Sequence, residues 1–172
     1  MGEAVHLVKR FFGSLRPGGP KATEVAWVQA TLSEAEYELW GRMYGPDRRH
    51  SASVARDVEA TLGNAATAPV LAAALLHDVG KVQSGLRTYT RVMATLSAKV
   101  AGRQTAELWA NGSGLTRRIG QYLLHDQIGA DLLEMAGSDP LTVAWAREHH
   151  LPRDQWTLPP DVAEALDAAD ND

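Results

Sequence analysis

Apolar residues recur along this chain mostly at intervals of three and four positions, which is the spacing of one face of an α-helix. Val54, Val58 and Leu62, for example, stand at every fourth position. The run at 70–76 is apolar at every position, as in a helix that is buried on all sides. No stretch alternates apolar and polar residues as a half-buried strand would. We therefore predict an all-α fold.

Residues that begin or end helices divide this pattern into separate elements. Ser33 and Glu36 have the form of a capping box, and Pro46 suits a first helical turn. Gly80 is expected to end the helix that contains the apolar run. The predicted helices cover residues 3–15, 21–32, 33–43, 46–62, 69–78, 87–100, 115–124, 128–135, 140–150 and 161–170. The stretch at 102–114 stays ambiguous.

Composition and charge narrow the class of protein. The 172 residues are 45% apolar and 22% charged, which suits one domain, with residues 1–45 as an appended helical layer on a core at 46–172. The absence of cysteine excludes disulfides, thiolate catalysis and cysteine-based metal clusters. A net charge of −4 argues against a stable nucleic-acid partner. The longest apolar run is too short for a transmembrane segment and no secretory leader opens the chain, so we expect a cytoplasmic protein.

The six histidines carry most of the candidate chemistry, because neutral imidazole is the commonest metal ligand in proteins. His77 and Asp78 end the apolar run and are followed closely by Lys81. A buried His-Asp pair must be hydrogen-bonded, ion-paired or metal-bound, since an unpaired buried charge is costly. Lys81 could meet a phosphate oxygen as a point charge. No role is assigned to His6.

The segment 75–81, Leu-Leu-His-Asp-Val-Gly-Lys, resembles the signature of the HD-domain superfamily, the all-α metal-dependent phosphohydrolases. The family pattern is a histidine, then a His-Asp pair, then a distant aspartate. His50 stands 27 positions before the His-Asp pair and fits the first histidine. Asp170 fits the last aspartate, with Asp167 one turn away as the alternative. The resemblance spans residues 47–170 and implies a single-domain HD-type helical bundle.

A further set of histidines extends the likeness. His125 is followed by Ile128 and Gly129, and His149 and His150 stand 24 and 25 positions after it. This order is similar to that of the extended subgroup that includes the HD-GYP phosphodiesterases, although the Gly-Tyr-Pro element is missing. The resemblance implies one metal ion on His50, His77, Asp78 and Asp170. It implies a second ion on Asp78 as a bridge and on His125 and His149, and it leaves His150 either as a ligand or as a residue that supports one.

Such a site implies hydrolysis of a phosphate ester. One or two divalent ions would activate a water molecule at His77 and Asp78, and mixed nitrogen and oxygen ligands favour Mn, Fe, Co or Zn over Mg. The expected substrate is a small phosphorylated, nucleotide-like molecule, either a phosphomonoester or a phosphodiester. Cations would anchor it, and the candidates are Lys81, Arg49, Arg87, Arg91 and Arg118. For Arg87 and Arg91 the alternative is a solvated helix face.

Two alternatives use the same ligands. A subset of HD-fold proteins are di-iron oxygenases, which bound iron and oxygen-dependent turnover would identify. A non-catalytic nucleotide-binding or sensor module, in which the metal staples the helical bundle, would load metal and hydrolyse no phosphoester. The amphipathic helix at 3–15 is expected to pack on its own domain or on the second copy of a homodimer rather than on a membrane.

Overall fold

The fold is seen in a computed structural model that describes residues 18–86 and 103–171. The helices predicted at 3–15 and 87–100 lie outside the described residues. The same holds for some of the side chains considered above, namely His6, Arg87 and Arg91.

The described chain is helical and contains no strand, so the all-α prediction is confirmed. The helices are α2 (Ala22–Thr31), α3 (Glu34–Arg42), α4 (Gly45–Leu62), α5 (Ala68–Leu76), α6 (Lys81–Ser84), α8 (Gly114–Leu123), α9 (His125–Met135), α10 (Pro140–Glu148) and α11 (Pro160–Asn171), with short 3-10 turns η1 (Gly63–Ala65) and η2 (Arg153–Gln155). The ambiguous stretch is helical at 103–110. In the described part, no helix has the length and apolar character needed to cross a membrane.

Local capping explains where several helices begin. The Ser33 hydroxyl accepts a hydrogen bond from the Glu36 main-chain N–H at 3.3 Å, and the Glu36 carboxylate accepts one from the Ser33 N–H at 3.0 Å. Asp139 caps α10 by accepting a hydrogen bond from the Leu141 N–H at 2.9 Å. Pro46 lies in the first turn of α4. These starts were predictable because each depends only on residues within one turn.

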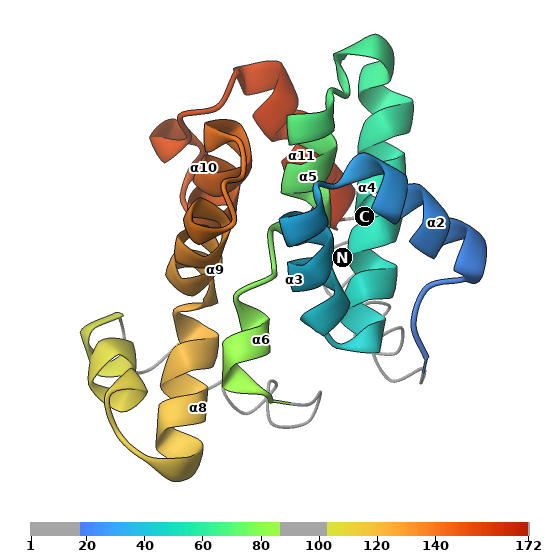
Figure 1. The fold of residues 1–172 in the computed structure, drawn as a ribbon. Helices are drawn as coiled ribbons and strands as arrows, with labels where there is room; N and C mark the ends of the chain where they lie inside the picture. Colours follow the sequence, from blue (N-terminus) through green and yellow to red (C-terminus); the bar gives the residue numbers. More distant parts are fainter. Residues whose placement is uncertain (1–17, 87–102, 172) are drawn as a thin grey trace, which may run out of the picture.

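Helix α5 forms the centre of the core. Its residues 70–76 are all buried, and the helix packs against α4 on one side and α10 on the other (Figure 1). Helix α11 packs in turn against α4, and α9 packs against α10. Because other helices surround α5, the residues that follow its last turn, His77 and Asp78, lie in the interior.

The structure corrects the predicted end of this central helix. Helix α5 stops at Leu76 rather than Asp78. The Val79 N–H donates to the Leu76 carbonyl at 2.9 Å and the Lys81 N–H donates to the Asp78 carbonyl at 3.1 Å, which is the tighter spacing of a 3-10 turn. His77 and Asp78 therefore lie on a tight turn between α5 and α6.

Gly80 lets α9 approach this turn closely. A Cβ atom at Gly80 would lie 1.9 Å from the His125 carbonyl oxygen and 2.6 Å from the Gly129 main-chain nitrogen. No side chain fits in that space without moving the backbone of α9. The contact brings the first turn of α9, which carries His125, beside Asp78.

Candidate metal centre

Three histidine rings are oriented in the same way by main-chain carbonyls. The Nδ1 of His77 donates to the Ala74 carbonyl at 2.9 Å, and that of His125 donates to the Tyr122 carbonyl at 2.7 Å. His149 repeats the arrangement with the preceding turn of α10, at 3.0 Å from the Ala146 carbonyl. Because a carbonyl only accepts hydrogen bonds, each Nδ1 carries the proton, and the neutral form of each ring keeps the lone pair of Nε2 for another partner.

One set of side chains, here the His50 group, comprises His50, His77 and Asp170. Asp170 Oδ1 lies 2.9 Å from His50 Nε2 and 3.5 Å from His77 Nε2. One ligand atom from each residue falls within 4.8 Å of the others. His50 comes from α4, His77 from the turn that follows α5, and Asp170 from α11, so distant parts of the chain meet here.

A second set, here the His125 group, comprises Asp78, His125, His149 and His150. Asp78 Oδ1 lies 3.3 Å from His125 Nε2 and 3.9 Å from His149 Nε2. His150 Nε2 lies 3.2 Å from His125 Nε2. The ligand atoms of these four residues also fall within 4.8 Å of one another.

Asp78, a member of the His125 group, also faces the His50 group. Its Oδ2 lies 3.5 Å from His77 Nε2, in the His50 group, while its Oδ1 faces His125. One carboxylate therefore presents one oxygen to His77 and the other to His125.

The residues fit a divalent ion. His77 Nε2 and His149 Nε2 are among the buried side-chain atoms of the described residues that have no hydrogen-bond partner, and Asp78 oxygens lie 3.5 and 3.9 Å from them. A buried polar atom without a partner costs free energy, and a coordinate bond to a metal would satisfy it. Each of these nitrogens lies in a different group and within reach of a carboxylate. Imidazole and carboxylate together suit a first-row transition ion.

Comparison with known proteins agrees with this geometry. The family model of the HD domain matches residues 48–172, a range that contains every member of both groups. The chain belongs to the HD domain family. Searches of curated proteins and of solved structures returned no match. The division of the chain between residues 45 and 46 stays a prediction.

Opposite charges surround the His-Asp pair of this HD domain. Burial alone would lower the pKa of His77, but the charges of Asp78 and Asp170 outweigh it and raise the pKa to about 10. Burial would raise the pKa of Asp78, but Lys81 and His77 hold it well below its usual range. The Lys81 ammonium contacts Asp78 Oδ2. Burial would lower the pKa of Lys81, but the charge of Asp78 outweighs it and raises that pKa. Asp78 is thus ionised at neutral pH, as a metal ligand must be.

The histidines at the end of α10 stay neutral. Burial and the neighbouring imidazole of His150 lower the pKa of His149 well below its usual range. Burial, followed by His125, lowers the pKa of His150 to about 4. Neutral rings can coordinate a metal at neutral pH without first losing a proton.

The structure separates the two candidates for the final aspartate. The carboxylate of Asp167 accepts a hydrogen bond from the Arg153 guanidinium at 2.8 Å, while Asp170 lies beside His50. Asp170 is therefore the aspartate that joins the histidines.

The described candidate cations are engaged in different ways. Lys81 contacts Asp78 directly, beside both groups. Arg49 donates to the Gly18 carbonyl at 2.8 Å. Arg118 donates to the Ser84 carbonyl at 2.8 Å and also contacts the Gly85 carbonyl, so its guanidinium supports the end of α6. Lys81 is the cation that the structure places at the site, and the substrate-binding roles of Arg49 and Arg118 stay predictions.

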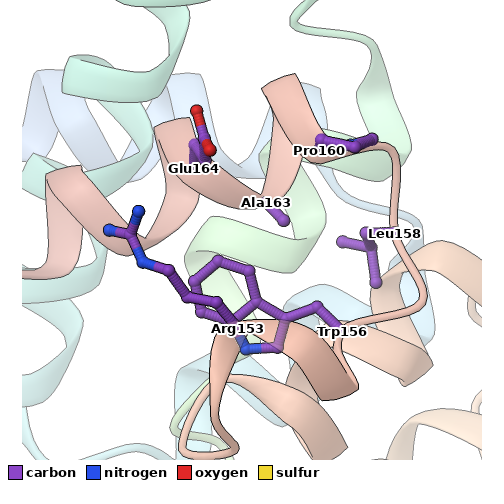
Figure 2. A pocket seen from close by; sticks show the side chains of 6 residues that line it. All are labelled: Arg153, Trp156, Leu158, Pro160, Ala163 and Glu164. Atoms are coloured by element: carbon purple, nitrogen blue, oxygen red, sulfur yellow. The ribbon is translucent and has the colours of Figure 1, made fainter.

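Trp156 packs inside the HD domain beside a small surface pocket. Its indole N–H donates to the Leu151 carbonyl at 3.1 Å, and its ring meets that of Trp145 edge-on, with centroids 5.5 Å apart. Figure 2 shows Trp156 and Arg153 facing α11 across the pocket, whose lining also includes Leu158, Pro160, Ala163 and Glu164. These contacts support a packing role for the tryptophan.

Sequence reasoning missed Glu148, the residue before His149. It is buried, and both of its carboxylate oxygens accept hydrogen bonds from Thr157. A negative charge in the last turn of a helix is unfavourable next to the negative end of the helix dipole. An acidic residue at this position was therefore a signal that could be read from the sequence.

Proposed function

We propose that this HD domain is a metal-dependent phosphohydrolase that acts on a phosphomonoester or phosphodiester of a small, nucleotide-like anion. The family supports metal-dependent phosphate chemistry in general. The observation that carries the proposal is the convergence of the His50 and His125 groups on the two oxygens of Asp78, with two buried Nε2 atoms that lack a partner.

Each group would hold one divalent ion. His50, His77 and Asp170 would bind the first together with Asp78, and Asp78 would share the second with His125, His149 and His150. The large number of imidazoles favours Mn, Fe, Co or Zn over Mg.

When bound, such ions lower the pKa of a coordinated water from about 16 toward 7 and so supply a nucleophile at neutral pH. The residues of the chain hold this centre in position. The Nδ1 hydrogen bonds of His77, His125 and His149 fix their rings, and Asp78 keeps the two groups adjacent. Lys81, beside Asp78, would offer positive charge to a phosphate oxygen.

The test begins with metal content and hydrolysis in the same preparations. Metal-free protein would be loaded with Mn²⁺, Co²⁺, Fe²⁺ or Zn²⁺ and assayed with nucleoside mono-, di- and triphosphates, cyclic nucleotides and nitrophenyl phosphate esters. We expect up to two ions per chain, and a loss of at least about 100-fold in kcat/KM for His77→Ala, because metal catalysis supplies several kcal/mol. His6→Ala is the matched control and should keep both metal and activity.

The same preparations separate the two alternatives. Iron that gives an absorption band and oxygen uptake, without phosphate release, would favour an oxygenase. Full metal loading without either activity would favour a binding or sensor module and would contradict the hydrolase.

A further inference from the structure

Glu148 is a buried carboxylate at the C-terminal end of α10, with 8% of its surface exposed. Its Oε2 accepts a hydrogen bond from the Thr157 main-chain N–H at 2.7 Å, and its Oε1 accepts one from the Thr157 hydroxyl at 2.7 Å. A negative charge at this place is opposed by the helix dipole and by burial. These costs indicate that the carboxylate contributes something other than helix stability.

The residue closes the turn that carries two members of the His125 group. The Leu151 N–H donates to the Glu148 carbonyl at 2.7 Å, so His149 and His150 lie within a turn whose first residue is Glu148. The side chain of Glu148 then fastens the same turn to Thr157, nine positions along the chain. Main chain and side chain of one residue therefore restrain both histidines.

The connection at 151–159, which carries Thr157, is tied to helices on both sides. Trp156 packs edge-on against Trp145 of α10. Arg153 reaches Asp167 of α11 at 2.8 Å, and Figure 2 shows its side chain extending along that helix. Loss of Glu148 would release the turn but leave the tie to α11, which carries Asp170.

We propose that Glu148 is a positioning residue that holds His149 and His150 in place for the metal ion of the His125 group. This inference rests on the proposed function, because it takes metal binding at that group from it. It adds that the effect is selective: the His125 group depends on Glu148, and the His50 group does not.

Two backgrounds isolate the groups. The variant His50→Ala lacks one ligand of the His50 group and keeps the His125 group whole. The variant His125→Ala lacks one ligand of the His125 group and keeps the His50 group whole. Co²⁺ alone would be titrated into each metal-free protein by calorimetry, with the visible absorption of bound Co²⁺ as a second readout. We expect Glu148→Ala to weaken Co²⁺ binding roughly 10- to 100-fold in the His50→Ala background, the usual range for residues that support metal ligands, and to leave the affinity unchanged in the His125→Ala background.

Glu148→Gln should restore binding to within a few-fold, because its amide oxygen can accept from the Thr157 N–H while its NH₂ donates to the Thr157 hydroxyl oxygen. Thr157→Val removes one of the two hydrogen bonds from an exposed residue and should give a smaller loss in the same background, which keeps the test valid where Glu148→Ala fails to fold. Glu134→Ala is the matched control. Its carboxylate pairs with Arg147 of α10 at 3.0 Å, outside the turn, and its loss should change neither affinity.

Equal losses in both backgrounds would overturn the inference, because they would show that Glu148 only stabilises the fold. No loss in either background would overturn it as well. Wild-type protein that binds no ion at all would instead remove the proposed function and this inference together, whereas two bound ions without hydrolysis would leave the positioning role of Glu148 intact.

Discussion

At the scale of single residues, Asp78 lies beside two cations, the half-buried ammonium of Lys81 and the buried, protonated ring of His77. Asp78→Ala would remove the carboxylate that contacts Lys81 and one of the two carboxylates that lie 3.5 Å from His77 Nε2, the other being that of Asp170. Removing one member of a buried ion pair costs about 3–5 kcal/mol, so we expect a loss of that order in the free energy of unfolding of metal-free protein. Urea unfolding followed by circular dichroism would measure it.

The double variant Asp78→Ala/Lys81→Met is the control for this prediction. Because it removes the ammonium together with its partner, it should recover about half of the lost stability or more. A single variant as stable as wild type would contradict the buried ion pair.

The shifted pKa values of His77 and His150 predict how the stability of the metal-free protein depends on pH. The pKa of His77 is raised from 6.5 to about 10, so its contribution is complete below pH 6.5 and is lost as the pH rises through 10. The pKa of His150 is lowered from 6.5 to about 4, so its contribution is present above pH 6.5 and is lost as the pH falls toward 4. Urea unfolding across this range should give maximal stability near pH 6.5.

His77→Gln isolates the alkaline part of that profile. The variant should lose much of the decline above pH 6.5 and keep the decline on the acid side, where His149 and His150 gain protons. A wild-type profile that stays flat from pH 6.5 to 10 would contradict the raised pKa of His77.

At the scale of elements, the position of α9 depends on Gly80. In Gly80→Ala the new Cβ would meet the backbone of α9 at His125 and Gly129, which cannot rotate away as a side chain could. We expect a loss of about 1–3 kcal/mol in the free energy of unfolding and weaker metal binding at the His125 group. Thermal unfolding and metal titration would measure the two effects.

Gly41→Ala is the matched control, because a Cβ at this position of α3 meets nothing within 4 Å. It should be neutral or stabilising by up to about 1 kcal/mol, since alanine favours a helix over glycine. Equal effects of the two substitutions would show that the close approach of α9 to the His-Asp turn is unimportant.

Helix starts marked by a local capping residue were predictable from sequence, whereas the start of α9 at His125 rather than 128, helix α6 and the contacts between elements were not. Ser33 and Asp139 cap helices through residues within one turn, so local pattern was sufficient. The early end of α5 accompanies a turn packed against α9, which no local pattern contains. Similarly, sequence left Asp167 and Asp170 as alternatives, because they are separated only by tertiary contacts: Asp167 pairs with Arg153, and Asp170 lies beside His50. The family resemblance named the histidines in order, but the carbonyls that orient their rings became visible only in three dimensions.

At the scale of the whole molecule, the candidate site joins parts of the chain that are far apart in sequence. His50 and Asp170, 120 positions apart, meet in one group, and Asp78 connects that group to His125 of α9 and to His149 at the end of α10. Metal bound here would therefore link helices from most of the described chain. Since the folded state alone assembles the ligands, each ion should stabilise folding according to its affinity.

Removal of metal should thus lower the melting temperature of the whole domain. At a free metal concentration about 100 times Kd, one ion contributes about 2.7 kcal/mol, which corresponds to about 5–10 °C for a chain of this length. Differential scanning calorimetry with and without a chelator would measure the shift, and circular dichroism should show that helix content at 20 °C is retained, because the apolar core does not include the metal. His77→Ala should respond less to the chelator than wild type does. Equal melting temperatures with and without metal, in protein shown to bind it, would mean that the ligands do not hold the helices together.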